Sequence, residues 1–517
     1  MSAPSAAYPP PPLEGGQRTL ATIAVSLAMF MNVLDTTIAN VSIPAISGDV
    51  GVSPTQGTWV ITSFAVANAI SVPLTGWLAQ RFGQVRLFVA SVLLFVAASL
   101  MCGLSNSLQM LIFFRVIQGA VAGPMIPLSQ ALLLQSYPKE KAPMALAAWS
   151  MTTLVAPVMG PILGGWLTDN LTWPWIFYIN IPVGLLAAWM TWLMLKERES
   201  PIRKKPIDTI GLALLVVWVG ALQIVLDKGR ELDWFNSPEI LFLMAAAVVG
   251  FCFFLAWELT DEHPVVDLRL FAERNFSLGT LTLALGYAVF FGNVVLMPLW
   301  LQQYMGYTAT WAGLVTAPIG FLAILLTPVV GKIMPRVDHR ALATSAFLIF
   351  ALVFFMRAGF TADADVPTIV LPQVIQGAGA ATFFIPLMAI ILSGIPHHKI
   401  PSASGLTNFA RITAGAFGAS ISTTWWDHRA SHHHAQMVDG LNAYNPVVTQ
   451  GLHDMGQLGL DQGQALQWLN RVLDVQAYTM GADDLFWGGG VLMLGLVVLV
   501  WFTRPERGGS SDGGGAH

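Results

Sequence analysis

Charged residues are scarce in this 517-residue sequence, in which Lys, Arg, Asp and Glu make up 10% of the chain, against about 25% in a typical soluble domain. The hydrophobic fraction of 55% therefore predicts a protein that crosses a membrane many times. Cysteine is scarce too. Cys102 and Cys252 each lie inside an apolar run, which predicts neither a disulfide framework nor a thiolate metal site. No basic run of the kind that binds nucleic acid is present, so a nucleic-acid partner is not expected.

Motifs of ATP-driven pumps and of hydrolytic enzymes are absent as well. No segment has the form GxxxxGK followed by Ser or Thr, and none has the HExxH pattern of a zinc hydrolase. Nothing in the chain resembles a nucleophile paired with a general base. The sequence therefore indicates neither enzymatic activity nor a cofactor.

Long apolar runs, by contrast, fill most of the chain. Fourteen of them are long enough to cross a bilayer, since about 20 residues at 1.5 Å per residue cover the hydrocarbon core. They lie at 19–46, 57–79, 86–105, 108–135, 142–166, 173–195, 209–227, 239–259, 276–304, 311–334, 341–360, 366–394, 402–426 and 485–503.

Basic residues predict the orientation of these spans, because Lys and Arg gather in cytoplasmic loops. With both termini in the cytoplasm, 18 of the 25 Lys and Arg residues fall on the inner side. Two lie within spans, Arg115 and Arg411, and five fall on the outer side, namely Lys228, Arg230, Arg357, Arg429 and Arg471. We therefore expect both termini to be cytoplasmic.

The chain also contains an internal repeat. Val-Ile-Gln-Gly-Ala at 116–120 recurs at 374–378, which is 258 residues later. We therefore predict an all-α polytopic membrane protein whose 14 transmembrane helices form two six-helix parallel repeats plus two inserted helices, with a substrate site between the halves. The predicted parts are a disordered cytoplasmic tail (1–18), an N-terminal bundle (19–195), a basic cytoplasmic loop (196–208), two inserted helices (209–259), a C-terminal bundle (276–503) that includes a periplasmic loop (427–484), and a cytoplasmic tail (504–517).

Asp35 is the one acid deep inside a span, and Arg115 is its predicted partner. Asp35 lies 11 residues from the outer end of its span and Arg115 lies 7 residues into another, depths of about 16 and 10 Å that a long guanidinium bridges. A carboxylate in a span costs roughly 2.5–3.5 kcal/mol and is by default a functional-site hypothesis. We predict that Asp35 and Arg115 couple the protein to protons; the alternative is an Asp that caps or pins a helix.

The second half lacks this charged pair, because the repeat places Asn293 opposite Asp35 and Gln373 opposite Arg115. Arg411, nine residues into its span, is a further coupling candidate, or else a structural arginine bonded to carbonyls. The outer cluster His432, His433 and His434 is expected to have a structural or surface role, because three adjacent histidines point in different directions on a helix.

Met, aromatic and amide side chains predict a cavity for apolar or amphipathic ligands, although the same residues are also suited to helix packing. The candidates are Met31, Asn32, Ile38, Gln118, Phe291, Asn293, Met297, Gln373 and Gln376.

Glycine and proline mark segments with a predicted role in gating or packing. In span 5, prolines remove backbone donors and favour a bend, while glycines four residues apart allow close helix approach. Basic residues and glycines between spans 2 and 3 form a tight inner turn, which topology alone also explains. These residues are Gly76, Arg81, Gly83, Arg86, Gly119, Pro157, Gly160, Pro161 and Gly164.

Together these motifs resemble the major facilitator superfamily, and within it the fourteen-span drug:proton antiporters of the EmrB type. The matching segments are Leu34–Val41, Gly76–Arg86, Arg115–Gly119, Gly160–Gly165 and Trp175–Gly184. Gln80 stands where many members of the superfamily have Asp, so a gating role of that acid does not carry over to this chain.

The resemblance implies export of hydrophobic or amphipathic compounds by alternating access, driven by the proton gradient without a cofactor. It implies a multi-pass protein of the inner membrane that meets a periplasmic adaptor of the EmrA type and an outer-membrane channel of the TolC type. Two alternatives remain open, a proton-coupled nutrient symporter and a receptor that binds its ligand without transport.

Overall fold

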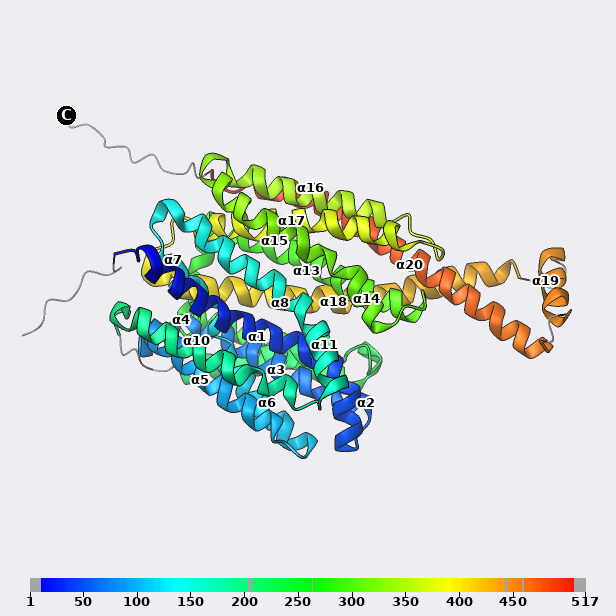
Figure 1. Ribbon diagram of the computed structural model, residues 1–517, viewed down its shortest axis with the longest axis horizontal. Helices are drawn as coiled ribbons and strands as arrows, with labels where there is room; N and C mark the ends of the chain where they lie inside the picture. The colour runs from blue at the N-terminus through cyan, green and yellow to red at the C-terminus, as the bar shows by residue number, and fades with distance from the viewer. Residues whose placement is uncertain are drawn as a thin grey trace, which may run out of the picture.

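The protein is a bundle of helices that run side by side along the long axis of the molecule (Figure 1). The computed structural model describes residues 11–202, 206, 208–262, 264–441, 445–457 and 460–505, and every regular element in that part of the chain is a helix. At Pro157 and Pro161 it describes the backbone only, as part of α8. The predicted all-α fold is confirmed.

The first half contains ten helices in the described residues, and proline interrupts two of its spans. Span 2 is divided by a 3-10 turn that contains Pro73, and span 4 is divided at Gly123 and Pro124, because proline has no N–H for the helical ladder. The helices are α1 (Gly15–Val50), α2 (Pro54–Gly57), α3 (Trp59–Ser71), α4 (Thr75–Phe82), α5 (Gln84–Gly103), α6 (Leu108–Ala122), α7 (Met125–Ser136), α8 (Ala142–Asn170), α9 (Trp175–Tyr178) and α10 (Asn180–Leu195).

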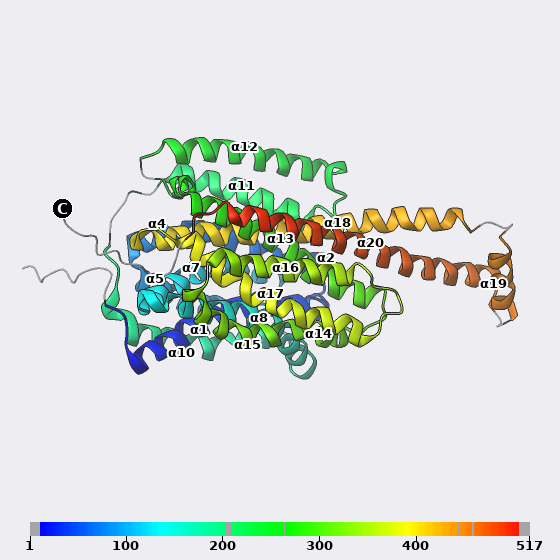
Figure 2. The same cartoon turned by 90° about the horizontal axis from the view of Figure 1, so that it is seen from above.

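Two inserted helices, α11 (Thr209–Lys228) and α12 (Pro238–Thr260), lie along one edge of the bundle (Figure 2). α11 packs against α3 of the first half and α18 of the second, and α12 packs against α11. The second half consists of α13 (Arg274–Gln303), α14 (Ala309–Thr316), α15 (Pro318–Ile333), α16 (His339–Arg357), α17 (Val366–Leu392), α18 (Ile400–Asp439), α19 (Pro446–Gln457) and α20 (Gln462–Trp501).

Each of the 14 predicted spans falls on one or more of these helices. Twelve helical segments in the described residues are long and apolar enough to cross a membrane, and α8 and α18 cover the two other predicted spans. The predicted tails differ in extent. α1 already begins at Gly15, four residues before the predicted span, whereas residues 1–10 and 506–517 lie outside the described part of the chain.

Residues 427–484, predicted as a periplasmic loop, are largely helical in the described part of the chain. α18 continues to Asp439, α19 follows, and α20 starts at Gln462. Together these parts form a helical hairpin that projects beyond the bundle, at the end opposite to residues 11 and 505 (Figures 1 and 2). We call 427–484 the hairpin, its side of the molecule the hairpin end, and the opposite side the terminal end. The helices continue because neither glycine nor proline occurs in 419–439 or 464–480, and polar residues alone do not end a helix.

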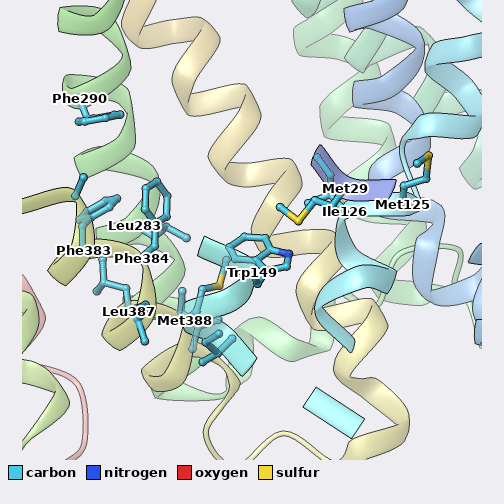
Figure 3. Packing of buried hydrophobic residues seen from close by; sticks show 14 of the residues in the cluster. Met29, Met125, Ile126, Trp149, Leu283, Phe290, Phe383, Phe384, Leu387 and Met388 are labelled. Atoms are coloured by element: carbon cyan, nitrogen blue, oxygen red, sulfur yellow. The ribbon is translucent and has the colours of Figure 1, made fainter. Parts of the chain in front are cut away.

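The two halves touch at the terminal end. A Cβ at Gly76 would lie 2.7 Å from the Cα of Ser402, so α4 and α18 approach as closely as glycine allows. α8 and α15 pack together as well. Figure 3 shows the buried Trp149 of α8 between Met29 and Ile126 on one side and Leu387, Met388 and the Phe383–Phe384 pair on the other. Apolar side chains thus fill the space between the two halves around Trp149.

Candidate functional site

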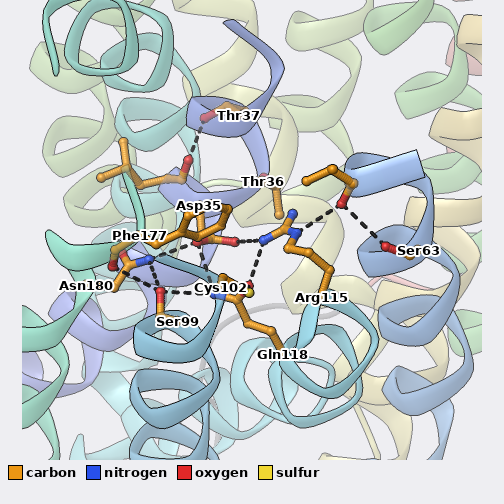
Figure 4. Close-up of polar contacts among 12 residues, drawn as sticks. Asp35, Thr36, Thr37, Ser63, Ser99, Cys102, Arg115, Gln118, Phe177 and Asn180 are labelled. Carbon is orange, nitrogen blue, oxygen red and sulfur yellow. Dashed lines mark hydrogen bonds and ion pairs between the residues drawn. The ribbon is translucent and has the colours of Figure 1, made fainter. Parts of the chain in front are cut away.

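Asp35 and Arg115 form a buried ion pair (Figure 4). Arg115 Nη1 donates to Asp35 Oδ2 at 2.6 Å, and neither residue is exposed. Asp35 comes from α1 and Arg115 from α6, so the contact predicted from their depths in the two spans is present.

The second oxygen of Asp35 is held by two amides. Its Oδ1 accepts from Gln118 Nε2 at 3.1 Å and from Asn180 Nδ2 at 2.8 Å. Both amides also donate to Ser99 Oγ, at 3.3 and 2.9 Å. The carboxylate therefore joins α1 to α6 and α10 through three hydrogen-bond donors.

Arg115 is held on all sides of its guanidinium. Its Nε donates to the carbonyl of Val60 at 3.0 Å, and Nη1 also donates to Gln118 Oε1 at 2.8 Å. The rings of Phe64 and Phe177 lie 4.2 and 5.6 Å from its Cζ, which adds cation–π attraction away from water. The adjacent Gly119 leaves no room for a side chain against the Phe64 carbonyl, which is why α6 comes close enough to α3 for these contacts.

Protonation would change the charge balance of this pair. With Asp35 ionised the pair is neutral overall, whereas a protonated Asp35 would leave the positive charge of Arg115 without its counter-charge. The arrangement is therefore suited to converting proton binding into a change in how α1, α6 and α10 pack.

Sequence reasoning missed two members of this cluster, Ser99 and Asn180. Asn180 lies in the Trp175–Gly184 segment that carries the family resemblance, and its place in that segment is the one signal that could have indicated it. Ser99 had no such signal, because serines are common in apolar helices and only the fold brings this one to Asp35.

The other cavity candidates of the first half are packed inside the bundle. Asn32 Nδ2 donates to the carbonyl of Ala122 at 3.1 Å and so ties α1 to the end of α6. Met31 and Ile38 are buried and lie beside Gly184 and Gly164, respectively. Gln118 belongs to the ion-pair cluster.

Two candidates of the second half, Arg411 and Phe291, contact the same aromatic ring. Arg411 lies over the ring of Tyr287 at 4.9 Å, and Phe291 stacks on the same ring at 5.6 Å. Arg411 Nη2 donates to Asn408 Oδ1 at 3.1 Å, so its bonded partner is a side-chain amide rather than a backbone carbonyl. The remaining candidates, Asn293, Met297, Gln373 and Gln376, are all buried.

Arg357 differs from its predicted place in an outer segment. It is the last residue of α16 and is fully buried, with Nη2 donating to Gln376 Oε1 at 2.6 Å. Hydropathy alone does not locate the end of a span to within a turn, and the chain after α16 folds back so that Phe360 is buried too.

The glycine motif of span 5 serves close packing in this structure. Gly160 lies against Thr37, and a Cβ at Gly164 would be 2.9 Å from the carbonyl of Ile38, so α8 and α1 touch through their backbones. The side chains of Pro157 and Pro161, from the same predicted motif, lie outside the described part of the structure.

The carboxylate of Glu199 lies against the turn between spans 2 and 3. Gly83 has φ +87°, and α5 starts directly after it. Glu199, from the predicted basic loop, accepts from the backbone N–H groups of Val85 and Arg86 at 3.0 and 2.9 Å. This carboxylate stabilises the N-terminus of α5, while Arg86 lies 3.9 Å from it and Arg81 lies over Trp77 at 5.5 Å.

The histidine cluster joins the two long helices of the hairpin. His433 Nε2 and Arg429 Nε both lie 2.7 Å from Asp484 Oδ2, and His434 Nε2 lies 3.2 Å from Asn470 Oδ1. Among the described residues, no group of three or more His, Cys, Asp or Glu side chains is placed to hold a metal ion.

Comparison with known proteins gives a close relationship over nearly the whole chain. The model of the Major Facilitator Superfamily matches residues 25–419. The chain is 52% identical to the Multidrug export protein EmrB of Haemophilus influenzae, covering 96% of this chain and 98% of the relative. It is 51% identical to the protein of the same name in Escherichia coli K12, covering 98% and 99%.

A third relative is named for resistance to fatty acids. The chain is 46% identical to the Fatty acid resistance protein FarB of Neisseria gonorrhoeae, covering 98% of this chain and 99% of the relative. Among solved structures, the proton:xylose symporter XylE matches with a TM-score of 0.60 and 13% identity, covering 95% of this chain and 97% of that one. Such low identity shows the fold alone.

The family model covers most of the chain, and relatives above 50% identity cover almost all of it. The resemblance predicted from the sequence motifs is thus confirmed, including the multi-pass membrane architecture. Members of this family are transporters and not enzymes. The chain belongs to the major facilitator superfamily and, within it, to the drug antiporters related to the multidrug export protein EmrB.

Proposed function

We propose that the protein is a proton-coupled exporter of hydrophobic or amphipathic compounds that works by alternating access. The observation that carries this proposal is the fully buried Asp35–Arg115 pair, whose carboxylate joins three helices through three donors. An ionisable group buried in a span is rarely retained without a function. The relatives named for multidrug export and for fatty acid resistance support export as the direction.

In the proposed cycle, a state open to the outer side takes a proton onto Asp35. The neutral carboxyl holds Arg115 less strongly, α1 and α6 shift relative to each other, and the protein opens to the inner side. Substrate then binds and promotes release of the proton, so that proton and substrate exclude each other. The proton gradient supplies the energy, about 2.3 kcal/mol per charge for every 100 mV of potential, and no cofactor takes part.

Proton movement in sealed proteoliposomes tests this proposal. We expect a lipophilic compound to trigger proton flux with the wild type and with Glu262→Gln, a control that changes an exposed acid. Asp35→Asn should bind the compound and abolish the flux. Equal flux in Asp35→Asn would contradict the assignment of Asp35. Proton movement in the same direction as the compound would favour a symporter, and binding without any flux would favour a receptor.

We further propose that the protein lies in the inner membrane with both termini in the cytoplasm, which places the hairpin in the periplasm. There the hairpin would meet an adaptor of the EmrA type, which in turn meets an outer-membrane channel of the TolC type. The support is its shape and surface, because it extends past the bundle (Figure 1) and exposes Leu466 and Trp468. These two large apolar side chains point to different sides of α20, and both are available to contact a partner.

Co-purification from membranes tests the adaptor proposal. The double variant Leu466→Arg/Trp468→Arg should lose a tagged EmrA-type adaptor and keep substrate-triggered proton flux in proteoliposomes. The control Gln467→Arg adds a charge at an exposed polar position of the same helix and should retain the adaptor. Full retention by the double variant would contradict docking at this surface.

A further inference from the structure

The second half of the protein contains a buried arginine whose partners are incomplete. Arg357 has no exposed surface, and its one hydrogen bond runs from Nη2 to Gln376 Oε1 at 2.6 Å. Its Nε and Nη1 have no partner, and neither does Nε2 of Gln376. Buried charges in proteins are normally paired, so this guanidinium stands out from Arg115, which has a carboxylate, an amide and a carbonyl as acceptors.

The internal repeat explains why the charge is unpaired. The offset of 258 residues relates Gln118 to Gln376 and Ser99 to Arg357, so Arg357 stands beside its glutamine as Ser99 stands beside Gln118 in the first half. The position equivalent to Asp35 is Asn293. The second half has thus kept the amide and gained a cation, while the carboxylate has been replaced by a neutral side chain.

No acid of the described residues compensates this charge. Arg357 takes part in none of the ion pairs formed there. The acid on the neighbouring α20 at this level is Asp483, which accepts from the backbone of Phe360, and its Oδ1 has no hydrogen-bond partner at all. No hydrogen bond or ion pair joins Arg357 to Asp483 in the described residues.

Arg357 lies where aromatic side chains join α13 to α16 and to the residues that follow α16. The rings of Phe290 and Phe350 meet at 5.6 Å, and those of Trp300 and Phe360 meet at 5.7 Å. Asn293 lies between Phe290 and Trp300 in the sequence, and Arg357 lies between Phe350 and Phe360. Because Arg357 is fully buried, its uncompensated charge is strongly unfavourable.

We propose that Arg357 and Gln376 form a binding site for a small monovalent anionic group. The unpartnered atoms of the two side chains, Nε and Nη1 of Arg357 and Nε2 of Gln376, are all donors, and the one amide oxygen is already used by Nη2. A set of donors around a fixed positive charge selects an anion over water or a cation. Chloride and the carboxylate of an organic compound share this chemistry. The site does not depend on the transport function proposed above.

Thermal unfolding of the purified full-length protein tests this site. Salts of chloride, acetate and benzoate are compared with gluconate, a larger and strongly hydrated anion, at constant ionic strength and without a proton gradient. We expect a saturable rise of Tm. A rise with chloride identifies an inorganic anion as occupant, and a rise with benzoate or acetate alone identifies an organic carboxylate. Equal Tm values in all four salts would overturn the proposal.

Two variants at Gln376 test the site without removing the buried arginine. Gln376→Glu places a carboxylate against Arg357 and should raise Tm in gluconate while abolishing the anion-dependent rise. Gln376→Met, which has similar volume and no charge, should lower Tm in gluconate. Persistence of the anion-dependent rise in Gln376→Glu, or equal loss of stability in both variants, would show that the anion acts elsewhere.

Discussion

Asn180→Leu tests how the cluster around Asp35 sets its affinity for protons. The substitution keeps the number and branching of the side-chain heavy atoms and removes the 2.8 Å donor to Asp35 Oδ1. A hydrogen bond to a charged group contributes about 1.5–3 kcal/mol, which corresponds to roughly a 10- to 150-fold change in the proton-binding equilibrium. Because the lost donor favours the ionised carboxylate, proton binding should become tighter.

The assay is the pH dependence of substrate-triggered proton flux in proteoliposomes. In Asn180→Leu, the pH of half-maximal flux should move upward by about 1 to 2 units, since the carboxylate holds its proton to higher pH. Asn170→Leu, an exposed asparagine at the end of α8, should leave the profile unchanged. A shift of the Asn180→Leu profile toward lower pH, or no shift at all, would refute the role given to this donor.

Three further changes have expected outcomes in thermal unfolding. Gly164→Leu should lower stability by about 1–3 kcal/mol, because its Cβ meets the backbone of α1, whereas Gly165→Leu, with open space at its Cβ, should be tolerated. Glu199→Gln should cost about 1 kcal/mol through weaker capping of α5. The hydrogen bond from the Arg340 side chain holds the pKa of Asp338 below its usual range. The ionised Asp338 side chain therefore stabilises the folded protein at pH values above the unfolded-state pKa, and this stabilisation is lost as pH falls through the folded-state pKa. Asp338→Asn should therefore lose stability at neutral pH but not at low pH, and equal loss at both would contradict this.

The Asp35–Arg115 contact could be predicted because charge is so rare in the spans that depth alone suggested the pairing. Ser99 and Asn180 complete the same cluster, yet neutral polar side chains in apolar helices carry no comparable signal. Arg357 shows the opposite failure, because a charge near the end of an apolar run was assigned to a loop. Its burial depends on how the chain after α16 folds back, which is a tertiary effect.

The helical structure of most of the hairpin was not predicted, for a different reason. The polarity of 427–484 suggested a loop, but absence of apolar surface indicates only that a segment leaves the membrane. Whether it remains helical depends on local propensity, and the long stretches free of glycine and proline gave that information.

The central claim is that Asp35 carries the transported proton, and infrared difference spectroscopy tests it most directly. Adding substrate at fixed pH should reduce the C=O absorption of a protonated carboxyl group in the wild type, because substrate promotes proton release. The same signal should be absent in Asp35→Asn and present in Glu262→Gln. An unchanged signal in Asp35→Asn would show that another group carries the proton and would contradict the account.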